Sequence, residues 1–207
     1  MKNKKLISII LPTLFGGISV AQAHDACMDI GTTNAQIAFG DCSEVWKTLK
    51  KSHKFPHIFS SSTPKLYPGL CFVSAPGGIP AKLGSIDINV TSASAWTTEF
   101  SPYLPPLLNG PDNIASIISK WTVTETHSNR LLGNIYTVDA LDTGNLNPAT
   151  PGAYTSSSVR LSELDVVIGG DRFFRGASGT VRIDSSLDLV SNSVNLTEIK
   201  GKICFDD

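Results

Sequence analysis

The sequence predicts an all-β protein in which an antiparallel eight-stranded β-barrel follows an irregular N-terminal extension. Beyond residue 66, short segments of alternating apolar and polar side chains are separated by segments rich in glycine, proline and asparagine. Such spacing gives about seven or eight strands in meander order, which is typical of a barrel. Barrel closure requires bends that glycines permit, and glycines lie inside or beside strands at positions 84, 133, 176, 179 and 201. A two-sheet sandwich is the alternative arrangement.

Residues 1–23 have the features of a secretory signal peptide. Three lysines form a basic start, residues 6–20 are largely apolar, and Ala21-Gln22-Ala23 matches a small-residue cleavage site. The apolar run is shorter than a membrane span and is interrupted by Pro12. We therefore predict an exported protein, periplasmic or extracellular, with no transmembrane segment once the signal is removed.

The 184 residues that follow the signal suit one domain with a core of its own. Without the three lysines of the signal, the 17 basic residues fall to 14 against 18 acidic ones, a formal charge of −4. No basic patch stands out, so nucleic acid is not an expected partner. The predicted organisation is a signal peptide (1–23), an irregular extension (24–65) and a barrel domain (66–207).

Within the extension, the segment Ser43 to Ser52 has a helical pattern. Ser43 is suited to cap this helix, and Val45, Trp46 and Leu49 share one of its faces. The rest of the extension, including a polar stretch before residue 65, is predicted to be loop.

Alternation is clearest at the start of the barrel domain. Ile86, Ile88 and Val90 share one face of a predicted strand, and polar side chains share the other. Proline- and glycine-rich segments interrupt the later strands and predict long loops at 100–113 and 142–158. The strands are predicted at residues 82–91, 117–126, 134–141, 161–168, 179–187 and 195–205.

The stretch from Gly169 to Val181 is the most specific motif in the chain. Its sequence, GGDRFFRGASGTV, joins a two-glycine turn, a pair of aromatic residues and a Gly-Ala-Ser-Gly run. This stretch resembles the hairpin of the allene oxide cyclase and dirigent-type barrels, a calycin-like group that includes secreted bacterial proteins of unknown role. The matching positions are Gly169, Gly170, Phe173, Gly176, Ala177 and Gly179.

This resemblance implies an eight-stranded barrel with an apolar cavity and a tendency to form homo-oligomers. Allene oxide cyclases isomerise an unsaturated epoxide derived from a fatty acid, and dirigent proteins steer the coupling of phenoxy radicals. Only the structural glycine motif matches, and no catalytic residue of either group is matched, so the activity does not carry over. The small residues of the motif either shape a barrel corner or leave room for a ligand.

All four cysteines, Cys27, Cys42, Cys71 and Cys204, follow the signal. An even number in an exported protein predicts two disulfides, and the absence of a C-x-x-C spacing disfavours a metal site. Spacing alone leaves three pairings open. In the barrel that the resemblance implies, the first strand region and the last are neighbours, which favours Cys71 with Cys204; Cys27 with Cys42 would then close a short loop.

Two sets of side chains are candidates for chemistry. Glu125 and His127 share one face of a predicted strand, and a carboxylate beside an imidazole can perform general acid–base catalysis. Signal cleavage makes His24 the first residue, and its amine and imidazole can chelate copper with His53, His57 or His127 as a further ligand. No nucleophile elbow, phosphate-binding loop or dinucleotide fingerprint is present in the sequence.

The expected function is the binding of a small apolar ligand, or a role as an envelope- or host-facing interaction module. Small barrels either fill their interior with side chains or hold one ligand, which is the physical basis for expecting a bound ligand. The alternatives are a cavity isomerase or cyclase and a copper-binding protein. No cofactor is expected.

Overall fold

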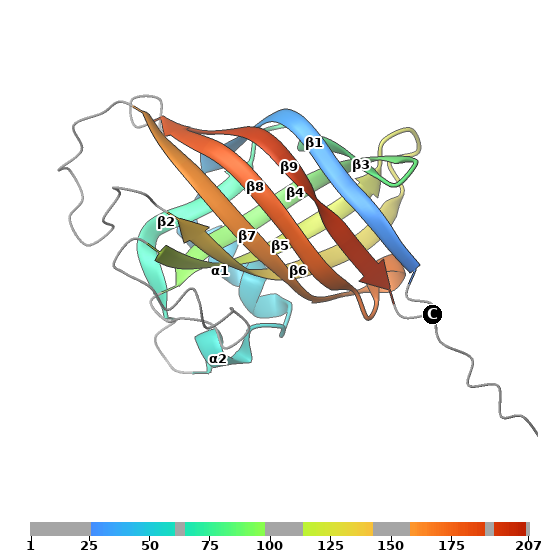
Figure 1. Cartoon of the computed structure of the whole chain (residues 1–207). Coiled ribbons are helices and arrows are strands. Elements are labelled where there is room, and N and C mark those ends of the chain that lie inside the picture. Colours follow the sequence, from blue (N-terminus) through green and yellow to red (C-terminus); the bar gives the residue numbers. More distant parts are fainter. Residues whose placement is uncertain (1–25, 61–64, 98–113, 143–157, 189–192, 206–207) are drawn as a thin grey trace, which may run out of the picture.

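In the computed structural model, residues 26–60, 65–97, 114–142, 158–188 and 193–205 are described, and they form a closed antiparallel β-barrel with two small helices on its outside (Figure 1). None of the described helices is long and apolar enough to cross a membrane. The strands are β1 (Ala26–Phe39), β2 (Leu66–Ser74), β3 (Ile79–Leu83), β4 (Ile86–Thr97), β5 (Ile114–Glu125), β6 (Leu131–Asp142), β7 (Ser158–Gly170), β8 (Ser178–Asp188) and β9 (Ser193–Phe205). The helices are α1 (Cys42–Lys51), α2 (Pro56–Phe59) and the short 3-10 helix η2 (Arg172–Phe174).

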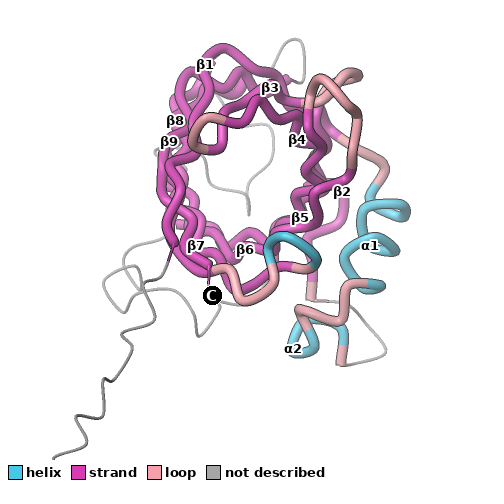
Figure 2. Tube along the Cα trace, turned by 90° about the vertical axis from the view of Figure 1, so that its right-hand side faces the viewer, coloured by secondary structure: helices cyan, strands magenta, loops and turns pink. Residues whose placement is uncertain are grey.

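The strands follow a meander, and the last strand closes on the first. β9 pairs with β1 over most of both strands, from Ala26 opposite Phe205 to Ala38 opposite Ser193. β2 and β3 both lie between β1 and β4, one after the other, so they share a single position in the ring. Nine strand segments therefore make the eight-stranded barrel seen end-on in Figure 2. The predicted fold class is confirmed.

The prediction that residues 24–65 are irregular is wrong, because β1 is a strand of the barrel and α1 and α2 follow it. The alternation of β1 is hard to see because it changes phase within the strand. Ile30 faces the inner core before the change, and Ala35 and Ile37 face it afterwards. Asn34, between them, has a left-handed backbone with φ of 58°, a conformation that asparagine tolerates better than most residues.

The predicted strand 82–91 is two strands. β3 ends at Leu83, β4 begins at Ile86, and Gly84 turns the chain between them with φ of 57°. A two-residue hairpin loop of this kind needs positive φ, which glycine supplies at no steric cost. Apolar residues on both sides of the turn gave the appearance of one continuous pattern. The predicted loops at 100–113 and 142–158 lie almost wholly outside the described residues.

The predicted helix is confirmed as α1, but its cap is different. The side chain of Asp41 accepts a hydrogen bond from the backbone N–H of Ser43 at 2.8 Å, so Asp41 and not Ser43 is the N-cap. Val45 and Leu49 are buried against the outer face of the barrel. Figure 2 shows α1 outside the ring, beside β2 and β4.

Two disulfides are present, as predicted, but the pairing of Cys71 with Cys204 is wrong. Cys27 is bonded to Cys204 and Cys42 to Cys71. The first bond joins directly opposed residues of β1 and β9 across the closing seam of the barrel. The neighbour of the last strand is thus β1, which the sequence reading had placed outside the barrel. Two disulfides are consistent with an oxidising compartment.

The Gly169–Val181 motif forms the corner between β7 and β8. This agrees with the expectation that its small residues shape a barrel corner. Phe174 is fully buried in the inner core, whereas Phe173 is 44% exposed. A Cβ atom at Gly179 would lie 2.1 Å from the carbonyl oxygen of Lys202, so only glycine allows β9 to approach this closely. Gly170 is equally constrained, because a Cβ there would lie 2.3 Å from the carbonyl oxygen of Phe174.

A buried carboxyl cluster as the candidate functional site

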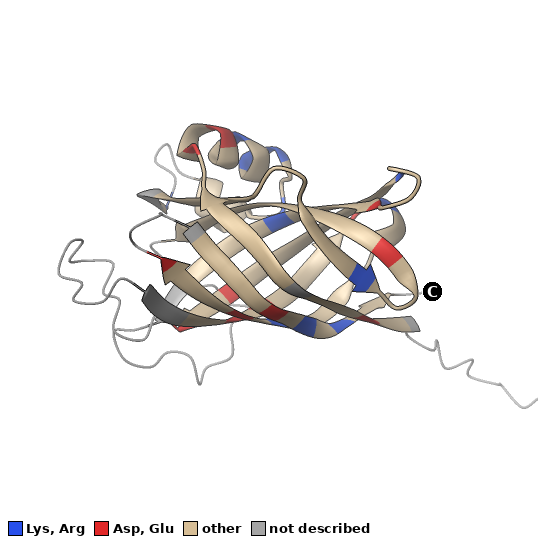
Figure 3. Cartoon of the chain, turned by 90° about the horizontal axis from the view of Figure 1, so that it is seen from above, with Lys and Arg blue, Asp and Glu red and all other residues tan. Residues whose placement is uncertain are grey.

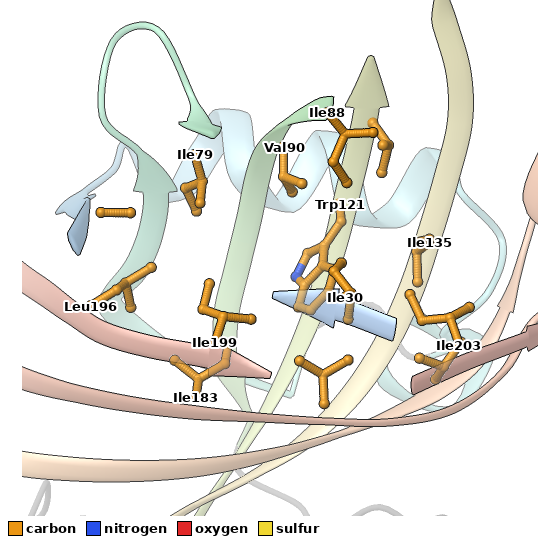
Figure 4. Close-up of a cluster of buried hydrophobic side chains, with 14 of the residues drawn as sticks. Ile30, Ile79, Ile88, Val90, Trp121, Ile135, Ile183, Leu196, Ile199 and Ile203 are labelled. Carbon is orange, nitrogen blue, oxygen red and sulfur yellow. The ribbon is translucent and has the colours of Figure 1, made fainter. Parts of the chain in front are cut away.

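The wall of the barrel separates two apolar cores. The outer core lies beneath α1 and α2 and includes Leu49, Ile118 and Val138. The inner core fills the barrel with aliphatic side chains and Trp121, shown in Figure 4. The two cores arise from one sequence pattern, because successive side chains of a strand point to opposite faces of the wall.

Three acidic side chains interrupt the inner core. Asp139 comes from β6, and Glu163 and Asp165 come from the same face of β7. The register places Asp139 directly opposite Asp165. One carboxylate oxygen from each of the three residues lies within 4.8 Å of the others. The topology therefore gathers three acids from two adjacent strands into one cluster, which we call the carboxyl cluster.

Few of the groups in this cluster have a hydrogen-bond partner. The hydroxyl of Ser119 donates to Oδ2 of Asp139 at 2.7 Å. Among the described residues, Oδ1 of Asp139 and Oδ1 of Asp165 are buried with no partner. No lysine, arginine or histidine is buried among the side chains that the structure describes. Buried carboxyl groups are normally hydrogen-bonded or paired with a positive charge, so this cluster is incomplete by itself.

Burial controls the protonation of the cluster. It raises the pKa of Asp139 to about 7, against the nearby hydroxyls of Thr137 and Ser119, which lower it. Burial, followed by the charge of Asp139, also raises the pKa of Glu163 and of Asp165 well above their ordinary values. Near neutral pH the cluster thus retains protons and can act both as hydrogen-bond donor and as acceptor.

Two cavities border the cluster. The first, of about 40 Å³, is lined by Glu163 and Asp165 together with Ser92, Ser119 and Trp121 and by aliphatic side chains. The second, of about 50 Å³, also touches Glu163 and is otherwise mainly apolar. Each holds a few water-sized groups, since about 10–15 Å³ is enough for one. Both are smaller than the roughly 300 Å³ at which sites for drug-sized ligands begin.

Beside the first cavity the barrel wall contains a short backbone pairing. β1 and β3 pair only through Ile30 with Leu83 and Gly31 with Lys82. Pro80 of β3 has no N–H to donate to a neighbouring strand. A surface groove of about 530 Å³ follows this junction, and Ala81 and Ile199 line both the groove and the cavity. The groove and the cavity thus lie on the two sides of the same stretch of wall.

The structure does not bring the predicted catalytic pair to a cavity. Glu125 ends β5 and accepts a hydrogen bond from Ser128 at 2.6 Å, with Arg130 at 3.4 Å. His127 lies in the following turn with its side chain 83% exposed, 3.6 Å from Asp87. His127 faces water, Glu125 is half-buried at the end of its strand, and neither residue lines the cavities described above. His24 lies outside the described residues, so the copper hypothesis stays a prediction.

The sequence does contain a signal for the acids that were missed. In β6 the inward positions are Ile135, Thr137, Asp139 and Leu141, and in β7 they are Leu161, Glu163, Asp165 and Val167. Acidic residues at apolar-face positions of a strand are rare unless they have a partner or a role. The register that joins the two strands is not visible in either segment alone.

The chemistry of this site is defined by its own groups: three carboxyls, several hydroxyls, two cavities and no buried base among the described side chains. Such a set can bind a cation or a hydrogen-bonding group, and it can exchange protons with a bound molecule. Comparison of the chain with family models, with curated proteins and with solved structures gives no match.

Proposed function

We propose that the protein is an exported barrel that binds one small molecule in its interior. The ligand has a mainly apolar body and a single polar group, which the carboxyl cluster holds. One observation carries this proposal: a cluster of three carboxyl groups, two of them buried and one half-buried, has no buried basic partner among the described side chains, and Glu163 and Asp165 line cavities that are otherwise mainly apolar.

The energetics of the interior support a missing polar partner. A buried polar atom without a hydrogen bond costs about 1–3 kcal/mol, and the cluster contains two such oxygens, on Asp139 and Asp165. A hydroxyl, amine or carbonyl group on a ligand regains that energy. The aliphatic and tryptophan side chains around the cluster accept the rest of the molecule.

The size and setting of the site restrict the ligand further. With cavities of about 40 and 50 Å³, the body is a branched chain or small ring, unless side chains move aside. The likeness of the Gly169–Thr180 hairpin to the allene oxide cyclase and dirigent-type barrels adds support, since those barrels enclose apolar cavities. Basic and acidic residues are interspersed along the described strands in the view of Figure 3, which favours no particular macromolecular partner for an interaction module.

The proposal is tested with three probes that share one body. Isobutanol, isobutylamine and isopentane differ only in the group that would meet the carboxyl cluster. We expect the alcohol and the amine to raise the melting temperature more than the hydrocarbon does. In Glu163→Leu this preference should disappear, whereas Asp184→Asn, which alters a carboxylate on the outer face, should retain it. Equal effects of all three probes on the wild-type protein would contradict the proposal.

A second candidate function is acid–base catalysis on the bound molecule, as in a cavity isomerase. The specific observation is a carboxyl group, Asp139, whose pKa of about 7 suits proton transfer near neutral pH. The test is exchange of the α-protons of 3-methylbutanone for deuterium, followed by NMR. Wild-type protein should accelerate the exchange and Asp139→Asn should not; equal rates would remove this candidate.

A further inference from the structure

We propose that the carboxyl cluster is a binding site for a hard divalent cation of the size of Ca²⁺. Oxygen atoms of Asp139, Glu163 and Asp165 hold the ion, and Ser92 and water complete its shell. This inference goes beyond the organic ligand and does not rest on it, because the ion is tested alone.

The spread of the three acids fits such an ion. Their nearest oxygens lie within 4.8 Å of one another. Ca²⁺ takes oxygen ligands at about 2.3–2.6 Å, so oxygens within 4.8 Å of one another can share one such ion. Mg²⁺ needs near-ideal octahedral geometry and usually keeps several of its waters, for which a cavity of about 40 Å³ has little room. The size of the cavity therefore favours the larger ion, which loses its waters more readily.

Ser92 supplies an independent indication that something binds here. Its side chain is 8% exposed, and its hydroxyl has no hydrogen-bond partner among the described residues. It comes from β4, away from the strands that carry the acids, yet it lines the same cavity as Glu163 and Asp165. A buried hydroxyl without a partner is expected to contact a ligand or an ordered water. The cavity of about 40 Å³ has room for an ion with one or two waters.

Charge and donor type point to the same class of ion. When the three carboxyl groups give up their protons to a bound ion, no buried basic residue among the described side chains balances their charge, and a divalent ion cancels two thirds of it. All the available donors are oxygens, since no histidine is buried among the described side chains and all four cysteines are in disulfides. Oxygen-only sites prefer Ca²⁺, Mg²⁺ or Mn²⁺ to softer metals.

The test uses Tb³⁺, which replaces Ca²⁺ and becomes luminescent when a nearby tryptophan is excited. Trp121 lines the cavity beside Glu163 and Asp165, so bound Tb³⁺ will be sensitised. The full chain with both disulfides intact, without any organic ligand, should give emission that Ca²⁺ abolishes and that Mg²⁺ abolishes only at higher concentration. Trp121→Phe should weaken the emission without changing the affinity for Ca²⁺.

Matched variants separate the site from the surface and from folding. Glu163→Gln should bind Ca²⁺ at least about tenfold more weakly, while Asp184→Asn on the outer face should bind as the wild type does. Ca²⁺ should raise the melting temperature of the wild type but not that of Glu163→Gln, although the metal-free variant should melt at least as high. No Ca²⁺-sensitive emission from the wild type, or unchanged affinity in Glu163→Gln, would overturn the proposal. Either result leaves the probe series for the organic ligand unaffected.

Discussion

The two faces of strand β6 surround carboxyl groups with opposite environments. On the outer face, Asp171 accepts hydrogen bonds from the backbone and side-chain amides of Asn134, each at 2.8 Å, and from Tyr136 at 3.2 Å. On the inner face, Asp139 is gathered with two further acids and no base, and one of its oxygens has no partner among the described residues. The outer carboxylate completes a structural clamp, whereas the inner cluster has more acceptors than donors.

The difference also appears in the protonation of the two regions. Burial raises the pKa of Asp171, but the hydrogen bonds from Asn134 and Tyr136 outweigh burial and leave it lowered. In the interior the hydrogen bond from Ser119 does not outweigh burial, and the pKa of Asp139 reaches about 7. A folded protein tolerates such an interior only at a cost in stability, which is the reason for proposing that the cluster serves binding.

The largest expected effect is an opposite pH response of the two regions. The raised pKa of Asp139 means that its native state holds a proton that the unfolded chain loses, so stability falls as pH rises from 3.8 to about 7. That shift corresponds to about 4 kcal/mol. Asp171 acts oppositely: its lowered pKa adds stability above 3.8 that is lost as pH falls through the native value.

Urea denaturation over a pH series, with EDTA present, measures this response. We expect the free energy of unfolding to decline between pH 4 and 7 in the wild-type protein. Asp139→Asn should make the decline smaller, with Glu163 and Asp165 maintaining the rest of it, and Asp171→Asn should leave it in place. A free energy of unfolding that rises between pH 4 and 7 would show that hydrogen bonds or charges in the interior offset the effect of burial on these acids.

The next largest effect concerns the outer clamp alone. Asp171→Ala removes the acceptor for both amides of Asn134 and leaves these half-buried donors without a partner. We expect a loss of about 2 kcal/mol in the free energy of unfolding at pH 7. Asp29→Ala, which alters an exposed acid in β1, is the control and should change stability little. Equal losses of stability in Asp171→Ala and Asp29→Ala would mean that the hydrogen bonds of Asp171 contribute no more than an exposed carboxylate does.

Substitution of an acid in the carboxyl cluster should raise the free energy of unfolding instead of lowering it. Asp165→Asn keeps the shape of the side chain and removes a group that burial forces to stay protonated. We expect it to raise the free energy of unfolding at pH 7 by about 1.5 kcal/mol. The gain should vanish below pH 3.8, where the unfolded chain is protonated as well. A destabilised variant at pH 7 would place Asp165 in a structural network.

Sequence reasoning succeeds where one strand contains the whole signal. The strands from β5 to β9 and helix α1 follow from local periodicity, as does the corner at Gly169–Val181, whereas β3 and β4 were predicted as one strand. β1 was missed because its alternation changes phase at Asn34, where a left-handed residue redirects the side chains. That single omission also produced the wrong cysteine pairing, since Cys27 could not be placed beside Cys204 without β1.

The carboxyl cluster could not be predicted from local sequence patterns, for a different reason. Asp139 and Asp165 each stand at an inward position of their own strand, but only the register of β6 against β7 sets them side by side. Glu125 and His127 formed the more obvious pair because they are close in sequence. Their strand ends at Glu125, so the alternation that placed them on one face stops before His127. Long-range pairing, and not composition, determines which acids meet.

The smallest expected effect distinguishes two hydroxyls of the inner wall. Ser119 donates to Asp139, so Ser119→Ala removes a donor from a cluster that has few and should cost about 1 kcal/mol. Ser92 has no partner among the described residues, so Ser92→Ala should change the free energy of unfolding by less than about 0.5 kcal/mol in EDTA. Urea denaturation of both variants measures the difference. If Ser92→Ala lowers the free energy of unfolding as much as Ser119→Ala does, the hydroxyl of Ser92 already has a hydrogen-bond partner in the folded protein. The contrast between a completed outer face and an incomplete inner face would then not hold at Ser92. If instead the stability cost of Ser92→Ala emerges only when Ca²⁺ is added, the hydroxyl serves the bound ion and not the fold.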